Sequence, residues 1–378
     1  MITLNDQQEL AIKTVRDKIK SGQKIITIAG FAGTGKTTLV NYIIESLGYT
    51  IEDVAFAAFT GKASLVLQQK GIPATTLHAL LYTSFRNVDG SFSHIIKKEL
   101  DKEYKLIVID EISMTPMELL RVALIHDIPI IALGDIGQLP PIGEDNGLLR
   151  SPDVILTEIM RQEKDNPIIQ LSLDIREGRP LQIQRNDNII ILEKKDLVSG
   201  MLSWADQVIC GYNETRSLLN RTMRADLGFE DDLPMVGEKI ICLKNYWTTF
   251  SKSNRFSLTN GAIGQIEDIS LRTKEYYQIN LKPDYADDSF IGLPIDLNPF
   301  LGKPYEYKPI KKYGSKWKKK PIETKHFDFG YAITCHKSQG SQYDKVLVYE
   351  EVLNRSLHKQ WLYTAVTRAE NKLIIIKE

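Results

Sequence analysis

Short apolar runs alternate with amphipathic stretches through the first half of the chain. Apolar runs occupy residues 24–30, 54–60, 105–110 and 128–135, and their length and β-branched content predict buried strands. Apolar residues recur at helical spacing near residues 6–20, 36–46, 61–70 and 115–126. Strands that alternate with helices in this way predict an α/β fold built on a parallel sheet.

A second set of apolar runs appears later, at residues 206–212, 238–243, 344–350 and 371–378. The pattern changes between about 237 and 325, where Gly, Pro, Tyr and Lys are frequent and short alternating stretches predict a small β-barrel-like insertion. We therefore expect an N-terminal α/β domain at 1–155, a second at 156–236 and 326–378, and the insertion at 237–325.

Composition limits the class of protein. A chain of 378 residues with 25% charged and 43% apolar residues is expected to fold into two or three globular domains. No apolar run approaches the roughly 18 residues that span a bilayer, and the first ten residues lack the apolar core of a signal peptide. These features predict a cytoplasmic protein without a membrane partner. The isolated Cys210, Cys242 and Cys335 are expected to be small core residues.

The stretch "ITIAGFAGTGKTTLV" (26–40) carries the clearest chemistry. Its frame Gly30-x-x-x-x-Gly35-Lys36-Thr37 follows a predicted strand and precedes a predicted helix. In this context backbone N–H groups surround a polyphosphate, the lysine reaches its outer phosphates, and the threonine hydroxyl binds Mg²⁺. The sequence therefore predicts a nucleotide site with ATP and Mg²⁺, held by the loop residues Gly33, Thr34, Gly35, Lys36, Thr37 and Thr38.

Two acids end the predicted strand "LIVID". Asp110 and Glu111 are expected at the carboxyl edge of the sheet, beside the phosphate loop. Asp110 is predicted to hold Mg²⁺ together with Thr37, and Glu111 to polarise the attacking water. Gln138, in "GDIGQLPP", follows another predicted strand, where its amide is expected to contact the γ-phosphate.

Two arginines are candidates for stabilising the charge that develops during phosphoryl transfer. Arg161 lies in "LTEIMRQ" and Arg368 in "YTAVTRAENK". In isolation, residue type favours an ordinary surface arginine for either, and it is the surrounding sequence that favours the catalytic role.

Local charge is more informative than the net charge, which is zero. Nine lysines and three tyrosines lie between 303 and 325 together with Trp317. Lysines for phosphates and aromatic rings for base stacking favour single-stranded nucleic acid. A solvated loop is the alternative.

Nine motifs together resemble one known family. In order, they are "GFAGTGKT", "AAFTGKAS", "TTLHALL", "LIVIDEISM", "GDIGQLPP", "LTEIMRQ", "LTNGAIG", "AITCHKSQGSQYD" and "WLYTAVTRAENKL". Their order and their extent, from about residue 4 to 373, resemble the superfamily 1 helicases, B branch (RecD-like and phage Dda-like enzymes). The resemblance implies two RecA-like domains with ATP bound between them, and an SH3-like insertion at 237–325.

The resemblance also assigns residues. It supports the catalytic roles of Lys36, Glu111, Gln138, Arg161 and Arg368, and adds Gln8 as an adenine contact and Gly340 as a contact near the sugar. Gln8 and Asn5 also fit a helix capping pair, and the two roles are compatible. The glutamate that commonly follows Gly340 is replaced by Gln342. The implied DNA contacts are Thr60, Gly61, Lys62, Thr76, His78, Thr334, His336 and Lys337. The two histidines fit packing roles equally well.

A hairpin at 82–96 is expected around Asp89-Gly90. It resembles the strand-separating pin of the B branch, with Phe85 or Phe92 meeting the fork and Phe92 favoured. A surface hairpin is the alternative.

We therefore expect an ATP-dependent DNA helicase that moves along single-stranded DNA and unwinds duplex, 5′ to 3′ by resemblance, in replication or repair. Its expected partners are single-stranded and forked duplex DNA, with single-strand-binding or replication proteins as a further class, and the expected state is a monomer. Two alternatives remain. One is a nucleic-acid-stimulated ATPase that remodels protein–DNA complexes. The other is a kinase or GTPase-like switch, although the Asn-Lys-x-Asp guanine signature is absent.

Overall fold

The computed structural model describes residues 4–86, 92–140, 146–160, 165–253, 256–303 and 323–378. The chain divides into two compact units, one formed by 1–194 with 338–378 and the other by 195–337. Among the helices of these described segments, none combines the length and apolar content needed to cross a bilayer.

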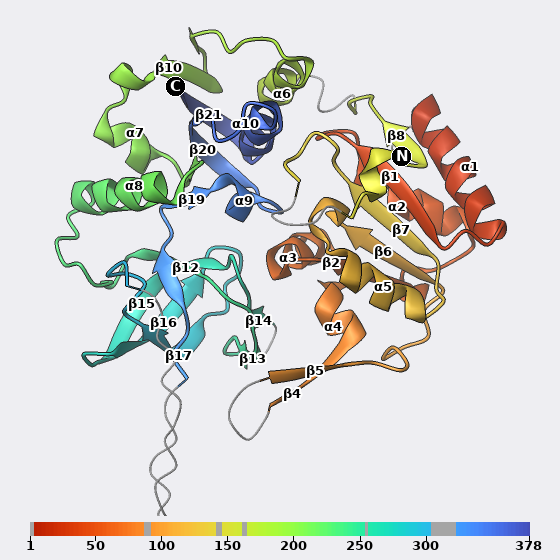
Figure 1. Cartoon of the computed structure of the whole chain (residues 1–378), viewed down its shortest axis with the longest axis horizontal. Coiled ribbons are helices and arrows are strands. Elements are labelled where there is room, and N and C mark those ends of the chain that lie inside the picture. Colours follow the sequence, from red (N-terminus) through yellow and green to blue (C-terminus); the bar gives the residue numbers. More distant parts are fainter. Residues whose placement is uncertain (1–3, 87–91, 141–145, 161–164, 254–255, 304–322) are drawn as a thin grey trace, which may run out of the picture. The chain divides into compact units, whose positions relative to one another are not determined.

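The first unit is built on a six-stranded parallel sheet of order β3-β2-β6-β7-β1-β8 (Figure 1). Its strands are β1 (Ile25–Gly30), β2 (Val54–Ala58), β3 (Ala74–Thr76), β6 (Leu106–Asp110), β7 (Ile130–Gly134) and β8 (Val154–Leu156). Its helices are α1 (Asp6–Lys20), α2 (Lys36–Ser46), α3 (Gly61–Gln69), α4 (Leu77–Leu81) and α5 (Met117–Ile125). The parallel α/β architecture predicted from the apolar runs is confirmed.

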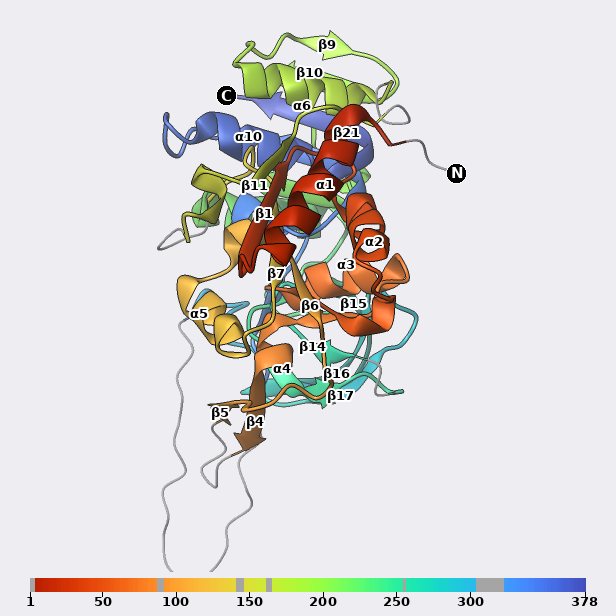
Figure 2. The same ribbon diagram turned by 90° about the vertical axis from the view of Figure 1, so that its right-hand side faces the viewer.

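Helices cover both faces of this sheet because successive strand residues point to opposite sides. Ile26 and Ile28 of β1 pack with α1, α2 and α3, whereas Ile107 and Ile109 of β6 pack with α4 and α5. Helices α1 and α2 lie side by side (Figure 2). Strands buried on both faces account for the nearly continuous apolar runs in the sequence.

The same unit contains a second group of strands in the order β20-β21-β10-β9. These are β9 (Gln184–Arg185), β10 (Ile189–Glu193), β20 (Tyr343–Tyr349) and β21 (Ala369–Lys377), accompanied by α6 (Pro167–Glu177) and α10 (His358–Val366). Strand β21 pairs in parallel with both β10 and β20. Beyond α4, strands β4 (Tyr82–Arg86) and β5 (Phe92–Ile96) form an antiparallel hairpin.

The second unit contains helices α7, α8 and α9, a parallel strand pair and a five-stranded antiparallel sheet. The helices are α7 (Ser199–Trp204), α8 (Asn213–Asp226) and α9 (Cys335–Ser338), and the parallel pair is β11 (Gln207–Cys210) with β19 (Ala332–Thr334). The sheet runs β17-β16-β15-β12-β18, from β12 (Lys239–Cys242), β15 (Ile263–Arg272), β16 (Tyr276–Pro283), β17 (Phe290–Asp296) and β18 (Phe327–Phe329). A small pair, β13 (Tyr246–Phe250) with β14 (Ser257–Leu258), accompanies it.

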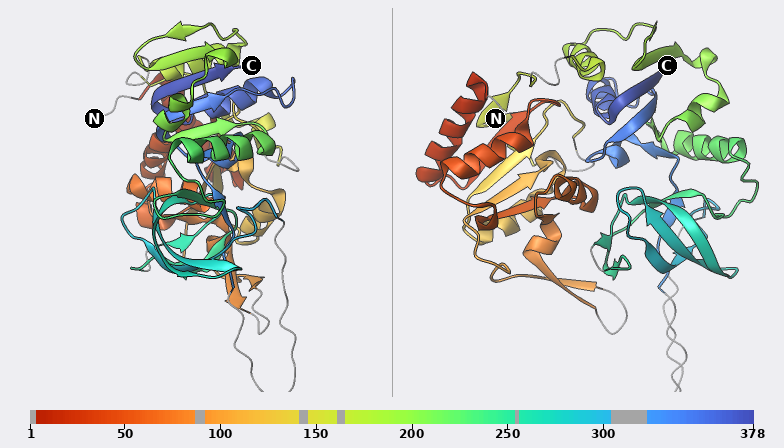
Figure 3. Two further views of the ribbon diagram at one scale, coloured as in Figure 1. Left: turned by 90° about the vertical axis from the view of Figure 1, so that its left-hand side faces the viewer. Right: turned by 180° about the vertical axis from the view of Figure 1, so that it is seen from behind.

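This antiparallel sheet curls until its two edges meet (Figure 3). Ile295 of the edge strand β17 bridges to Lys325, just before the opposite edge strand β18. Two backbone bonds secure the bridge, from Asp296 N–H to the Lys325 carbonyl (2.9 Å) and from Lys325 N–H to the Pro294 carbonyl (2.6 Å). The expected small barrel is present in this stretch, while its classification as SH3-like stays a prediction. Cys210, Cys242 and Cys335 are buried and unpaired with one another, as expected for core residues.

Candidate nucleotide site

The phosphate loop joins β1 to α2, as the sequence predicts. Gly33 and Gly35 have φ values of 75° and 76°, in the left-handed region that favours glycine. At Gly30 a Cβ would lie 2.7 Å from the Thr34 hydroxyl oxygen. The glycines therefore allow the tight turn that points the backbone N–H groups and the start of α2 toward one point.

Lys36 lies at the first position of α2. Its Nζ donates to the carbonyls of Gly30 (2.8 Å) and Phe31 (2.9 Å). The ammonium group is thus held at the mouth of the loop, where the outer phosphates of a bound nucleotide are expected. Thr37 and Thr38 follow in the first helical turn.

Asp110 and Glu111 meet the loop at the carboxyl end of β6. Glu111 has φ 53°, an uncommon conformation for a residue with a side chain that occurs often at functional sites. The pKa of Glu111 is raised to about 7, first by burial and then by the negative charge of Asp110, while Arg368 and Lys36 oppose the shift. Burial likewise raises the pKa of Asp110. Glu111 Oε2 has no hydrogen-bonding partner among the described residues.

The loop after β7 supplies Gln138, the predicted γ-phosphate contact. Its Nε2 lies 3.5 Å from Asp135 Oδ2, and its buried Oε1 has no partner in the described chain. Asp135 also accepts a bond from the Gly137 N–H at 2.9 Å. A buried amide oxygen without a donor lowers the stability of the fold. Gln138 and Glu111 therefore each present a hydrogen-bond acceptor that no described residue uses.

Tyr363 of α10 is the main residue that sequence reasoning missed. Its hydroxyl accepts a hydrogen bond from the Ala32 N–H in the phosphate loop (2.8 Å) and donates to Asp135 Oδ2 (2.9 Å). Its ring meets Phe31 edge-on, with ring centroids 6.4 Å apart. The hydroxyl is buried, and burial beside Asp135 raises its pKa well above the ordinary value. One side chain thus joins the phosphate loop to the loop after β7.

Two neighbouring bonds reinforce this junction. The Leu139 N–H donates to the Thr364 hydroxyl (2.8 Å), and Gln339 Nε2 donates to the Leu139 carbonyl (2.9 Å). Tyr363 and Thr364 both stand in the motif that carries Arg368, five and four residues before it. That proximity is the only signal in the sequence for their roles.

Arg368 is only 5% exposed, so the surface-arginine alternative is wrong for this residue. Its guanidinium donates to the carbonyls of Thr364 (3.0 Å) and Ser341 (3.2 Å) and to the Thr367 hydroxyl (3.1 Å). It lies close enough for its charge to lower the pKa of Glu111. Arg161, the other predicted arginine, falls outside the described residues.

Gln8 performs the capping role and also reaches the loop. Its Oε1 accepts the Asn5 N–H (3.1 Å), and its own N–H donates to Asn5 Oδ1 (2.9 Å), which makes a capping box at the start of α1. Its Nε2 contacts Met160 Sδ at 3.0 Å and the Thr34 carbonyl at 3.5 Å. The capping prediction is confirmed, and the adenine contact stays a prediction.

Several predicted DNA contacts lie at helix starts. The hydroxyls of Thr60 and Thr76 cap α3 and α4 by accepting the N–H groups of Ala63 and Ala79, each at 3.2 Å. Gly61 opens α3, and a Cβ on Gly340 would lie 3.2 Å from that of Ala63. These threonine hydroxyls already accept hydrogen bonds from backbone N–H groups of the protein.

Lys62 and His78 make aromatic contacts. Lys62 Nζ donates to the Tyr343 hydroxyl (3.0 Å) and lies 4.6 Å from its ring centroid. His78 stacks on Tyr82 with centroids 5.9 Å apart, and burial lowers its pKa. The packing alternative for His78 is thus supported. The side chains of Phe85 and Phe92 fall outside the described residues, as do Asp89 and Gly90.

The remaining DNA candidates lie in the second unit. Thr334 ends β19, and His336 and Lys337 belong to α9. Lys337 Nζ donates to Asn260 Oδ1 (2.8 Å), which brings the motif "LTNGAIG" to the same place. Burial lowers the pKa of both His336 and Lys337. Of the lysine-rich stretch, residues 304–322 lie outside the described structure.

Comparisons with known proteins agree with this geometry. Residues 3–198 match the AAA domain family model, and residues 329–376 match the UvrD-like helicase C-terminal domain. The chain belongs to the superfamily 1 helicases, B branch. The ATP-dependent RecD2 DNA helicase of Deinococcus radiodurans is 26% identical, with 93% of this chain and 47% of that protein covered. The ATP-dependent DNA helicase dda of phage T4 is also 26% identical, with 97% of each chain covered.

The fold of this helicase is that of two RecA-like α/β domains. The crystal structure of Bacteroides Pif1 bound to ssDNA matches it with a TM-score of 0.57 and 17% identity, over 100% of this chain and 93% of that one. The chain spans 47% of the length of RecD2 and 38% of that of a Methanocaldococcus jannaschii relative.

Proposed function

We propose that the chain is an ATP-driven DNA helicase whose ATP is hydrolysed between its two RecA-like parts. The observation that carries the proposal is the junction at Tyr363. A residue close to the C-terminus bonds to the phosphate loop and to Asp135, and Arg368 of the same motif acts on Glu111. Residues from both halves of the sequence thus complete one site, as a two-part motor requires.

The residues around the loop have distinct roles in the proposed reaction. Lys36 exchanges its two loop carbonyls for the outer phosphate oxygens, because phosphate is the stronger acceptor. Glu111 Oε2 accepts a proton from the attacking water, and its raised pKa makes it a stronger base than an exposed glutamate. Arg368 and Arg161 stabilise the charge on the transferred phosphoryl group. Gln138 donates from its side-chain N–H₂ group to the γ-phosphate, and its amide oxygen, which has no partner among the described residues, accepts a hydrogen bond from the attacking water.

The donor set fits a magnesium ion held jointly with the nucleotide. No cluster of three or more His, Cys, Asp or Glu residues able to hold a metal alone occurs in the described segments. Thr37 and Asp110 supply the oxygen ligands that Mg²⁺ prefers, and substrate phosphates complete such sites. When bound, Mg²⁺ neutralises the negative charge that builds up on the phosphate oxygens.

Single-stranded DNA is the proposed track, and 5′ to 3′ the proposed direction. Support comes from the family membership and from the motif residues Thr60, Thr76 and Lys337, all located at helix starts or in α9. The test measures ATPase activity with and without single strands, and then unwinding of duplexes that carry a 5′ or a 3′ tail. We expect strong stimulation and unwinding only with the 5′ tail.

The possible negative results have separate meanings. If single strands do not stimulate ATP turnover, the protein is a switch-like ATPase and the helicase proposal is refuted. Stimulated turnover without unwinding of either tailed duplex would instead favour the remodelling ATPase. Unwinding from the 3′ tail would overturn only the direction.

The β4–β5 hairpin is the proposed strand separator. Its backbone pairing runs in strict register from Tyr82 opposite Ile96 to Arg86 opposite Phe92, which favours a stiff element. We predict that Phe92→Ala, or failing that Phe85→Ala, sharply reduces unwinding while single-strand-stimulated ATPase stays near the parent value. If both variants unwind normally, or if ATPase falls in step with unwinding, the hairpin is structural only.

A further inference from the structure

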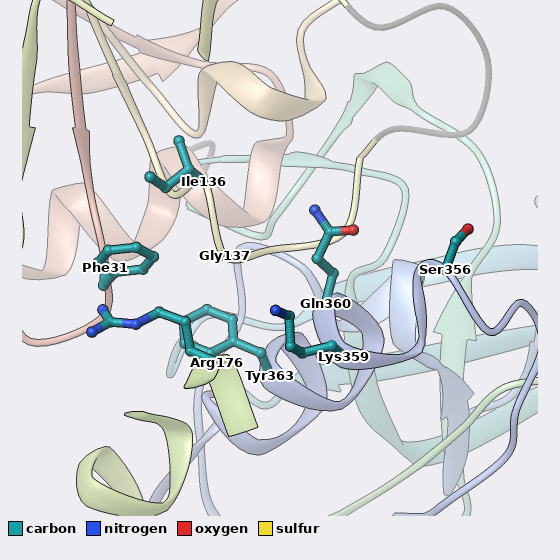
Figure 4. A pocket seen from close by; sticks show the side chains of 8 residues that line it. All are labelled: Phe31, Ile136, Gly137, Arg176, Ser356, Lys359, Gln360 and Tyr363. Atoms are coloured by element: carbon teal, nitrogen blue, oxygen red, sulfur yellow. The ribbon is translucent and has the colours of Figure 1, made fainter. Parts of the chain in front are cut away.

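A pocket of about 400 Å³ lies next to the phosphate loop, with Phe31 of that loop in its wall (Figure 4). Its walls come from the phosphate loop, the loop after β7, the last turn of α6 and the start of α10. The lining residues are Phe31, Ile136, Gly137, Arg176, Ser356, Lys359, Gln360 and Tyr363. Arg176, Lys359 and Gln360 take no part in the proposed hydrolysis step.

The lining is positively charged. Arg176 and Lys359 contribute two cations, and none of the eight residues is acidic. Within the described chain, neither cation forms an ion pair with an acidic side chain. Asp135 contacts Tyr363 but does not line the pocket, and its oxygens are already bonded to Tyr363, Gly137 and Gln138. The pocket therefore favours an anion.

Arg176 is held in position to bind that anion. Its guanidinium carbon lies 3.8 Å from the centroid of the Phe31 ring (Figure 4), so the ring fixes the group and leaves its N–H donors free at the edge. Nη1 is buried and has no hydrogen-bonding partner in the described structure. A buried charged donor without an acceptor is costly, which indicates that an acceptor binds here.

The location identifies the anion. Phe31 is shared by both sites, because its ring stacks on Arg176 while its carbonyl accepts Lys36 Nζ, the group expected on the outer phosphate. Gly137 lies between Asp135 and Gln138, on the loop that faces the γ-phosphate in the proposed reaction. The pocket and the expected γ-phosphate position thus share Phe31 and adjoin the same loop after β7.

We propose that this pocket is a transient binding site for the inorganic phosphate released by hydrolysis. The inference rests on the proposed ATPase function and adds a product subsite to it. Arg176 and Lys359 attract the dianion, and the Gln360 side-chain amide offers a neutral donor, whereas the Ser356 hydroxyl already donates to Asn354 Oδ1 (2.8 Å). Tyr363 contributes only its ring, because both bonds of its hydroxyl are in use.

The first test measures inhibition of single-strand-stimulated ATPase by added inorganic phosphate, with chloride replacing phosphate to keep ionic strength constant. We expect the phosphate inhibition constant to rise about tenfold in Arg176→Gln, the loss typical of one charge-assisted hydrogen bond, and about threefold in Lys359→Gln. Arg179→Gln is the matched control, because Arg179 lies just past the same helix and pairs with Asp174 and Glu177 away from the pocket. It should keep the parent constant.

A second test needs no turnover. Phosphate is titrated into the ADP-bound full chain and followed by ³¹P NMR line broadening, in the parent, Arg176→Gln and Arg179→Gln proteins. Weaker binding only in Arg176→Gln supports the subsite. Equal phosphate affinity in all three proteins overturns it, as does displacement of the phosphate by single-stranded DNA, which would make the pocket a site for the DNA backbone.

The two tests separate this inference from the function on which it rests. A parent protein that shows no DNA-stimulated ATPase refutes the helicase proposal, and the NMR titration still decides whether the pocket binds phosphate. If Arg176→Gln fails to fold, Lys359→Gln carries the same comparison, because Lys359 is exposed and outside the core. An unchanged inhibition constant in that variant then overturns the subsite.

Discussion

Two carboxylates with buried oxygens in this molecule have opposite surroundings. Glu238, in the second unit, is fully buried and bonded to Arg224 (2.6 Å), which is only 7% exposed. Both of its oxygens are used, since Oε2 also accepts the Met235 N–H (2.9 Å) and Arg224 Nη2 (3.1 Å). Glu111, beside the phosphate loop, keeps one buried oxygen without a described partner and has a left-handed backbone. A satisfied buried charge stabilises the fold, whereas an unsatisfied one marks the place where a ligand is expected.

Arg224 and Arg368 show the same contrast among cations. Arg224 is neutralised by Glu238 and stacks on Phe329, with its guanidinium carbon 3.9 Å from the ring centroid. Among the described residues, Arg368 bonds only to neutral oxygens, those of Thr364, Thr367 and Ser341, so its charge remains available to an anion.

The largest effect is expected from Lys36→Ala. This change removes the only ammonium group at the mouth of the loop among the described residues, so measurable ATP hydrolysis should vanish. Binding of single strands, followed by fluorescence anisotropy, should persist because Lys36 is bonded to the loop itself. Loss of both activities together would argue that nucleotide and DNA share one site.

Arg368→Gln is expected to lower ATP turnover by about 10³-fold or more, with a smaller change in ATP affinity, because the charge it meets develops in the transition state. Single-turnover hydrolysis and nucleotide binding are measured on the same preparation. Near-normal turnover would mean that Arg368 is structural, like Arg224.

The pair Glu111→Gln and Glu238→Gln tests the opening comparison directly. Glu111→Gln should lower turnover by about 10²-fold or more without lowering the melting temperature, because it removes an uncompensated buried acid. Glu238→Gln should instead lower the free energy of unfolding by about 3 kcal/mol, because it leaves the buried charge of Arg224 without a negatively charged partner. Thermal and urea unfolding are compared with turnover for both variants. Similar losses of stability in the two would remove the distinction.

The smallest effect is expected from Tyr363→Phe, which keeps the ring and deletes one hydroxyl. The Ala32 N–H and Asp135 each lose a partner, so turnover should fall about tenfold while the Michaelis constant for ATP changes less. Tyr42→Phe, at a tyrosine on α2, serves as the control. A Tyr363→Phe enzyme with parental kinetics would show that the junction does not position the loop.

The sequence predicted most of the first sheet and the local part of the site. The bounds of α1 and α2 follow from a capping box and from the phosphate loop, which are both local features. Lys36, Asp110, Glu111 and Gln138 were found because each follows a recognisable strand. In these cases the chemistry depends on residues a few positions apart.

The remaining features depend on contacts between distant segments. The Tyr363 hydroxyl bonds to Ala32, which is 331 positions away in the sequence. Arg176 is held in position by the ring of Phe31, which is also distant in the sequence. The bridge from Ile295 to Lys325 that closes the barrel likewise cannot be predicted from the periodicity of hydrophobic residues. Spacing rules describe neighbours along the chain, so they carry no information on which distant side chains pair.

Gly137 shows how little room the junction leaves. A Cβ at this position would lie 2.8 Å from Cε1 of Tyr363, a ring that is 2% exposed and anchored by its hydroxyl. The ring cannot swing aside as a flexible lysine would. The backbone of Gly137 and the Tyr363 ring are thus in close contact, and this contact sets the shortest approach of α10 to the loop after β7. A methyl group at position 137 would push these two segments apart.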